Sequence, residues 1–142
     1  MLARDIMTMR EVFSASDSDD AMTVARMLAA RNVASLPVVD RDGRLLGIVT
    51  DRDLACRILA EGRSYETPVR DIMSSPVRTV TLDSSLEEIE SVMRTNRVRH
   101  LPVLDEDNRL QGIISLSDLA RHCDTVHHER QLVGVLEAVS PF

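Results

Sequence analysis

Apolar residues along the chain follow two different spacings. Short runs of aliphatic and β-branched residues, typical of buried strands, occur at 36–39, 45–49, 101–104 and 110–114. The polar tetrapeptides 40–43 and 105–108 separate these runs in pairs, which predicts two hairpins. Elsewhere apolar residues recur every three or four positions, which predicts helices that each bury one face.

The whole pattern occurs twice, which indicates an internal duplication. Residues 36–55 match residues 101–120 at a constant shift of 65, with twelve identical positions. Upstream, Asp5-Ile6-Met7 returns as Asp71-Ile72-Met73 at a shift of 66. We therefore divide the sequence into a first repeat, a linker, a second repeat and a helical tail, at 1–62, 63–70, 71–122 and 123–142.

Each repeat is expected to fold as β-α-β-β-α. First strands are expected at Val12-Phe13 and at 77–80. The helices that follow have hydroxyl side chains as candidate N-caps, at Ser16 or Ser18 and at Ser84 or Ser85. Their expected buried faces comprise Ala21, Val24, Ala25 and Leu28 in one repeat, and Leu86, Ile89 and Met93 in the other.

A second helix follows each hairpin, from Asp51 or Asp53 to Glu61 and from Ser117 to about His122. One repeat alone would leave a face of its three-stranded sheet uncovered. Two repeats can bury these faces against each other. The sequence therefore predicts an α/β (α+β) protein in which tandem β-α-β-β-α repeats pack as a pseudo-twofold pair.

Charge and composition exclude several classes of protein. A net charge of −6 and a pI near 5.2 argue against general nucleic-acid binding. No apolar run reaches the roughly 18–20 residues of a membrane span, and the first residues lack the apolar centre of a signal peptide. We therefore expect a cytoplasmic protein without membrane contact, in which Cys56 and Cys123 are reduced and largely buried.

A hydroxyl residue stands three positions before an aspartate at the end of each hairpin, as Thr50 and Asp53 and as Ser115 and Asp118. One interpretation is helix capping, in which these side chains accept backbone N–H groups. A second is ligand binding, because free amides suit a phosphate and a carboxylate can accept the hydroxyls of a ribose. Both interpretations can hold together.

Basic residues precede only the second hairpin. Arg97, Arg99 and His100 stand there, whereas residues 32–35 of the first repeat carry no charge. Arginine offers a planar fork of donors for phosphate oxygens. The alternative is a solvated basic edge. Two candidate sites in the protein would therefore not be equivalent.

The ordered set of motifs, Asp-Ile-Met, Ser-Leu-Pro-Val-Val (35–39), Val-Arg-His-Leu-Pro-Val (98–103), GIVTDRDL (47–54) and GIISLSDL (112–119), resembles a tandem pair of CBS domains, named after cystathionine β-synthase. The resemblance spans residues 3–122. It implies a cleft between the two sheets that holds an adenosine-containing ligand, such as AMP, ADP, ATP, S-adenosylmethionine or an NAD-like compound.

The resemblance also implies which residues bind. One site would comprise Thr50, Asp53, Arg99, His100, Ser74, Pro76 and Val77. The other would comprise Ser115, Asp118, Ser35, Thr8 and Val12, without a basic residue before its Leu-Pro-Val strand. We therefore expect the site of Thr50 and Asp53 to be the stronger.

CBS pairs tend to form homodimers and to regulate enzymes, transporters or channels. We expect no attached catalytic domain, and the sequence contains no P-loop, Gly-x-Ser-x-Gly or HExxH motif. We expect a stand-alone, non-enzymatic regulatory module with an adenine nucleotide as ligand, no other cofactor, and a protein partner that the sequence does not identify. The alternative is a structural or interaction module with vestigial clefts.

The tail offers a further alternative. Leu132, Val133, Leu136 and Val139 have helical spacing, which predicts a helix docked on its own module or on a partner subunit. The preceding stretch contains His122, Cys123, His127 and His128. These residues suggest a metal- or redox-responsive protein, but a closed zinc site needs four well-placed ligands, so no metal is assigned.

Overall fold

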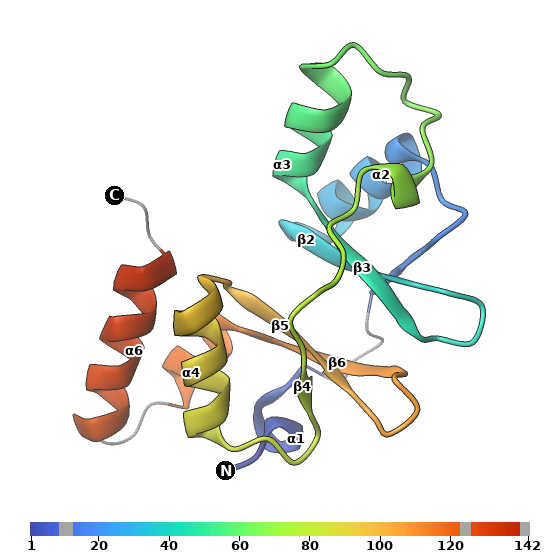
Figure 1. Cartoon of the computed structure of the whole chain (residues 1–142). Helices are drawn as coiled ribbons and strands as arrows, with labels where there is room; N and C mark the ends of the chain where they lie inside the picture. Colours follow the sequence, from blue (N-terminus) through green and yellow to red (C-terminus); the bar gives the residue numbers. More distant parts are fainter. Residues whose placement is uncertain (9–12, 123–125, 140–142) are drawn as a thin grey trace. The chain divides into compact units, whose positions relative to one another are not determined.

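The computed structural model describes residues 1–8, 13–122 and 126–139, without the side chains of 126–131 (Figure 1). The chain forms two compact units. Unit 2 comprises Phe13–Val77, and unit 1 comprises Met1–Val12 together with Arg78–Phe142. Each unit contains a three-stranded sheet and helices, which confirms the expected mixed fold of two related halves.

Unit 2 has its strands in the order β1-β2-β3, formed by Ala15–Ser16, Ser35–Val39 and Leu45–Thr50. The first pair is parallel and the second antiparallel. Its helical elements are α2 (Ala21–Arg31), α3 (Asp51–Asp53), the π-helical η1 (Leu54–Leu59) and the 3₁₀ turn η2 (Val69–Asp71). The parallel pair is possible because α2 connects its strands.

Unit 1 repeats this topology in the order β4-β5-β6, formed by Val80–Thr81, His100–Leu104 and Leu110–Ser115. Its helices are α1 (Ala3–Ile6), α4 (Leu86–Asn96), α5 (Leu116–Arg121) and α6 (Val126–Val139). Figure 1 shows α6 beside α4, and these helices contact each other. The tail therefore docks on its own unit.

The first segment of each repeat packs on the sheet of the other repeat. The Thr8 amide donates to the Ile113 carbonyl at 3.0 Å, within unit 1. Within unit 2, Ser74 and Ile48 exchange two backbone hydrogen bonds of 2.8 and 3.0 Å. The compact units therefore differ from the sequence repeats, because Asp5-Ile6-Met7 belongs in space with the second hairpin and Asp71-Ile72-Met73 with the first.

A glycine makes each of these contacts possible. A β-carbon at Gly47 would lie 2.7 Å from both the Met73 sulfur and the Ser74 carbonyl oxygen. At Gly112 it would lie 2.6 Å from the Met7 sulfur. Such distances are too short for any side chain, so a glycine is required where a neighbouring segment crosses the strand closely.

The first strands lie later in the sequence than predicted. Phe13 lies outside β1 and Val12 lies outside the described residues, while in the second repeat only Val80 of the expected 77–80 is in β4. The strands consist of the two residues that pair with β2 and β5, and this pairing, rather than β-branched composition, sets their bounds.

One of the two expected helix caps is correct. The Ser85 hydroxyl accepts from the Glu88 amide at 3.2 Å at the start of α4. Helix α2 is capped by Asp20, whose carboxylate accepts from the Thr23 amide at 2.8 Å. Ser16 and Ser18 are not caps, because Ser16 pairs with Val39 in the sheet and the chain turns before α2 begins.

The core of each unit follows the predicted stripes, with some exceptions. Ala21, Val24 and Leu28 are buried in unit 2, while Ala25 is only partly buried; Leu86, Ile89 and Met93 are buried in unit 1. Cys56 is exposed, contrary to expectation, because Leu54 and Ile58 form the packed face of that helix. Cys123 lies outside the described residues.

Helix α6 is also rotated relative to the prediction. Val135 is fully buried against the core of unit 1, with Leu132 and Val139 packed beside it. Val133 and Leu136 are 52% and 44% exposed. The contact with α4 selects this stripe, since the apolar residues of the tail offer more than one helical face.

No described helix is long and apolar enough to cross a membrane.

Candidate functional site

Thr50 and Asp53 form a capping box at the junction of β3 and α3. The Asp53 amide donates to the Thr50 hydroxyl at 3.1 Å, and the Thr50 amide donates to Oδ2 of Asp53 at 2.8 Å. This arrangement confirms the capping interpretation. It also fixes the carboxylate at the C-terminal end of a strand, with one oxygen held by the backbone.

Ser115 and Asp118 repeat the arrangement at the junction of β6 and α5. The Asp118 amide donates to the Ser115 hydroxyl at 3.1 Å, and the Ser115 amide donates to Oδ2 of Asp118 at 2.7 Å. The Ser115 hydroxyl lies 3.0 Å from the same Oδ2. Both aspartates therefore have a structural role as part of a capping box. A ligand can bind only to the carboxylate oxygen atoms that the capping box leaves free.

That remaining capacity differs between the two carboxylates. Oδ1 of Asp53 lies 3.6 Å from Nε of Arg57, beyond hydrogen-bond distance, and the side chain is 12% exposed. Oδ1 of Asp118 is hydrogen-bonded and ion-paired to Arg121, and its side chain is 5% exposed. Asp53 can therefore accept a hydroxyl hydrogen at Oδ1 with little rearrangement, whereas Asp118 would first have to release Arg121.

The hairpins bring further predicted site residues next to these junctions. In unit 2, Ser35 is the register partner of Thr50. In unit 1, His100 is the register partner of Ser115, and the Leu116 amide donates to the Arg99 carbonyl at 2.9 Å. Antiparallel pairing therefore places the residue before each Leu-Pro-Val strand beside the hydroxyl of its own repeat.

His100 is half-buried, and both a negative group, Asp118, and a positive group, Arg99, act on it. Burial lowers the pKa of the His100 imidazole below its ordinary value of 6.5; the Asp118 carboxylate opposes this shift, and the Arg99 guanidinium adds to it. The side chain is consequently neutral at pH 7 and above. It presents a donor and an acceptor rather than a fixed positive charge.

Ser74, Pro76 and Val77 follow Met73 in unit 2. Ser74 is held against Ile48 by the two backbone hydrogen bonds described above, Pro76 is exposed, and Val77 is partly buried. We call residues 72–77 the crossing segment, because the chain passes from here into unit 1 at Arg78.

Arg57 connects the crossing segment to Asp53, and sequence reasoning missed it. Its Nη1 donates to the Ile72 carbonyl at 2.9 Å and lies 3.4 Å from the Met73 carbonyl. The spacing of four residues from Asp53 on one helix is a signal that could have identified the pair.

The predicted site residues divide between the two units. Those of unit 2 are Ser35, Thr50, Asp53, Ser74, Pro76 and Val77, and those of unit 1 are Thr8, Arg99, His100, Ser115 and Asp118. Val12 lies outside the described residues. Both ligand sets implied by the sequence draw on both units, so their composition stays a prediction.

Of the four residues that suggest a metal site, only His122 has a described side chain. Nδ1 of His122 lies 2.8 Å from the Asp118 carbonyl oxygen, on its own helix. Cys123 and the side chains of His127 and His128 lie outside the described part of the chain. Within that part, no three His, Cys, Asp or Glu residues are grouped so as to hold a metal ion.

Comparison with known proteins places this arrangement in a family. Hypoxic response protein 1 of Mycobacterium tuberculosis is 32% identical over 121 residues, which cover 84% of this chain and 83% of that protein. A solved structure of Hypoxic Response Protein I with two coordinated zinc ions matches with a TM-score of 0.80 and 31% identity, over 87% of this chain and 100% of that one.

Two solved structures contain adenosine compounds. CBSX2 in complex with AMP is 26% identical and has a TM-score of 0.76, over 85% of this chain and 94% of that one. The CBS domain pair of protein MJ0100, in complex with 5'-methylthioadenosine and S-adenosyl-L-methionine, is 29% identical and also has a TM-score of 0.76, over 86% and 94%. The CBS domain model matches residues 3–60 and 69–124, so the chain belongs to the CBS domain family, with two CBS repeats.

Proposed function

We propose that the protein is a non-enzymatic regulatory module that binds an adenosine-containing ligand through the Thr50–Asp53 junction. The observation that carries the proposal is the free accepting capacity of Oδ1 of Asp53, on a carboxylate whose other oxygen is fixed by the Thr50 amide. A carboxylate held in this way is already ordered, so it loses little side-chain entropy when it accepts a ribose hydroxyl. The AMP complex of CBSX2 and the adenosyl complex of MJ0100 support the ligand class.

The remaining residues of the proposed site have complementary roles. Thr50 flanks the ribose-binding carboxylate, and Ser74, Pro76 and Val77 contribute backbone groups and an apolar surface for the base. A low aromatic content of 2% is consistent with a base held by aliphatic side chains. Arg99 and His100, which the family resemblance implies for the phosphate, stay a prediction from the sequence.

The site of Ser115 and Asp118 is proposed as the weaker one. Its carboxylate is already ion-paired with Arg121, so a ligand hydroxyl has to replace an existing partner. Binding there is therefore expected to require higher ligand concentrations than binding at Asp53.

Thermal unfolding with AMP, ATP, S-adenosylmethionine and NAD tests the proposal. A ligand that binds only the folded protein adds about 2.7 kcal/mol of stability at 100 times its dissociation constant. We expect a melting temperature that rises with the concentration of at least one of these compounds, and not with ribose-free adenine. A melting temperature that none of them changes at millimolar concentration favours the structural module with vestigial clefts.

A zinc-responsive protein is the second candidate, because Hypoxic Response Protein I coordinates two zinc ions. The residues that could serve here are His122, Cys123, His127 and His128. Metal analysis of protein purified without chelator tests this directly. About one equivalent of zinc per chain in the wild type, lost in Cys123→Ser, would establish the site. Less than about a tenth of an equivalent in the wild type would exclude it.

We also propose that the module is a homodimer in the cytoplasm. The apolar residues Val33, Leu59, Tyr65, Val133 and Leu136 are exposed in the single chain, which is consistent with coverage by a second copy. Light scattering measured with and without ligand tests the dimer, and a monomer under both conditions would contradict it.

A further inference from the structure

Arg57 occupies a position between the proposed ligand carboxylate and the crossing segment. Its Nη1 donates to the Ile72 carbonyl at 2.9 Å, while its Nε faces Oδ1 of Asp53 at 3.6 Å. The guanidinium therefore touches both the residue that would receive a ribose and the backbone that leads to Ser74, Pro76 and Val77.

We propose that Arg57 is a positioning residue that couples occupancy of Asp53 to the seating of residues 72–77. This inference rests on the proposed function of the Asp53 site and names the element through which a ligand there acts. The guanidinium is rigid and planar. A shift of this group toward or away from Asp53 therefore changes its hydrogen bond to the Ile72 carbonyl.

The Arg57 guanidinium faces the Asp53 carboxylate on one side and the Ile72 and Met73 carbonyls on the other. In the absence of ligand, the guanidinium balances the Asp53 carboxylate at a distance too long for a hydrogen bond. A ribose hydroxyl donating to Oδ1 withdraws part of the negative charge that Arg57 faces. The guanidinium then interacts more strongly with the Ile72 and Met73 carbonyls, which tightens the crossing segment on β3.

The crossing segment is suited to transmit this change. It is attached to β3 by the reciprocal Ser74 and Ile48 hydrogen bonds and by the packing of Met73 on Gly47. Immediately beyond it the chain enters unit 1 at Arg78. A ligand changes the protein's state only if it favours one arrangement over another, and tight against loose seating of this segment supplies two such arrangements.

The other repeat provides a comparison within the same chain. The residue at the position of Arg57, 65 residues later, is His122, and its Nδ1 lies 2.8 Å from the Asp118 carbonyl on its own helix. Asp118 is instead ion-paired with Arg121. Among the described residues, no basic side chain of α5 donates to the Ile6 or Met7 carbonyl, so the coupling is specific to unit 2.

Amide hydrogen exchange followed by NMR reads the proposed coupling at single groups. The Ser74 and Ile48 amides report the seating of the crossing segment, and the Thr8 amide, which donates to Ile113, reports the equivalent contact in unit 1. Without ligand, we expect Arg57→Met to raise exchange at Ser74 and Ile48 about tenfold or more, as loss of a charged hydrogen bond predicts. Exchange at Thr8 should stay unchanged, and Arg57→Lys should restore part of the protection.

With saturating AMP, exchange at Ser74 and Ile48 should slow further in the wild type. In Arg57→Met the Asp53 amide should still be protected by AMP, while the additional protection at Ser74 and Ile48 is lost. Equal AMP-induced protection at Ser74 in wild type and Arg57→Met would overturn the proposal. So would unchanged exchange at Ser74 in the ligand-free variant.

The two proposals fail in different ways. If Arg57→Met raises exchange at Ser74 and Ile48 without ligand, but no adenosine compound alters exchange at any amide of the wild type, the nucleotide site is refuted and Arg57 is a structural contact only. If AMP protects Asp53 but never Ser74, the nucleotide site stands and the coupling through Arg57 is refuted.

Discussion

Met73 lies directly over Gly47, although the two residues come from different repeats. A β-carbon at Gly47 would be 2.7 Å from the Met73 sulfur, and Met7 and Gly112 show the same relationship in unit 1. The Asp-Ile-Met motif is therefore a packing element: its methionine covers the strand whose glycine permits the approach. The motif and the glycine recur together because each requires the other.

Gly47→Ala is expected to destabilise the protein. The new methyl group must displace the Ser74 backbone as well as the methionine, and overpacking of this kind costs about 1–3 kcal/mol. Urea unfolding measures the change. Gly134→Ala is the matched control, since its nearest neighbours are Arg94 side-chain atoms at 3.7 Å and alanine favours a helix by about 1 kcal/mol over glycine. Equal loss of stability in both variants would contradict this account of Gly47.

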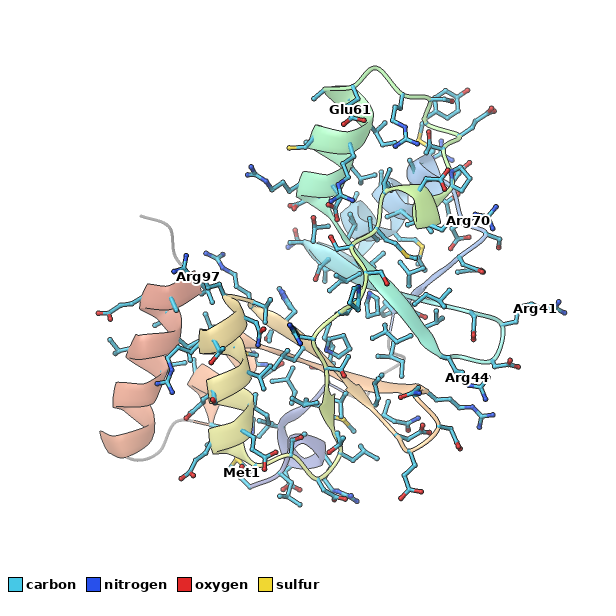
Figure 2. The ribbon with its side chains drawn as sticks, in the orientation of Figure 1. Met1, Arg41, Arg44, Glu61, Arg70 and Arg97 are labelled. Atoms are coloured by element: carbon cyan, nitrogen blue, oxygen red, sulfur yellow. The ribbon has the colours of Figure 1, made fainter. Side chains whose placement is uncertain are left out.

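Arg97→Asn is expected to stabilise the protein. Arg97 directly follows helix α4 and is labelled in Figure 2. Its φ of 54° lies in the left-handed region. Asn32 holds the same place after α2, with φ 52°. Asparagine tolerates this conformation better than arginine, by an amount on the order of 0.5–1 kcal/mol. The reciprocal variant Asn32→Arg should lose a similar amount, and a gain of stability there would refute the backbone argument.

His100 should make stability depend on pH. Burial holds the pKa of His100 in the folded protein below its ordinary value of 6.5, so the unfolded chain binds more protons between these two values. The contribution of neutral His100 to the free energy of unfolding is therefore complete above pH 6.5, and it is lost as the pH drops below that value. The groups that face the imidazole are Asp118, which opposes the shift, and Arg99, which adds to it.

Urea unfolding of the wild type and of His100→Gln between pH 7.5 and 5.5 measures this contribution. The variant should lose less stability over the interval than the wild type does. Identical slopes in the two proteins would show that His100 is accessible to protons in the folded state.

Much of the fold follows from local sequence patterns. The hairpin strands β2 and β3 begin and end within one residue of the predicted runs, because polar turns bound each apolar run. The capping boxes at Thr50 and Ser115 also follow from spacing alone. These features are set by neighbours in the chain, so the sequence is sufficient to predict them.

Features set by distant contacts could not be predicted in this way. Met7 and Met73 are equivalent in the sequence, and nothing local decides which hairpin each will cover. Ala15–Ser16 is a strand only through its pairing with β2, since neither residue favours a strand. The role of Arg57 depends on a contact with Ile72, fifteen residues away, and the second repeat has His122 at the matching position, so the duplication gives no sign of it.

Titration calorimetry with AMP on three proteins, the wild type, Asp53→Asn and Asp118→Asn, tests the central claim most directly. Asparagine retains one oxygen for capping but replaces the oxygen that would accept the ribose hydroxyl with an NH2 donor, so Asp53→Asn should weaken the tighter binding event about tenfold to a hundredfold. Asp118→Asn should leave that event unchanged. Unaltered AMP affinity in Asp53→Asn, with a folded protein, would contradict the assignment of Asp53 as the ligand-binding carboxylate.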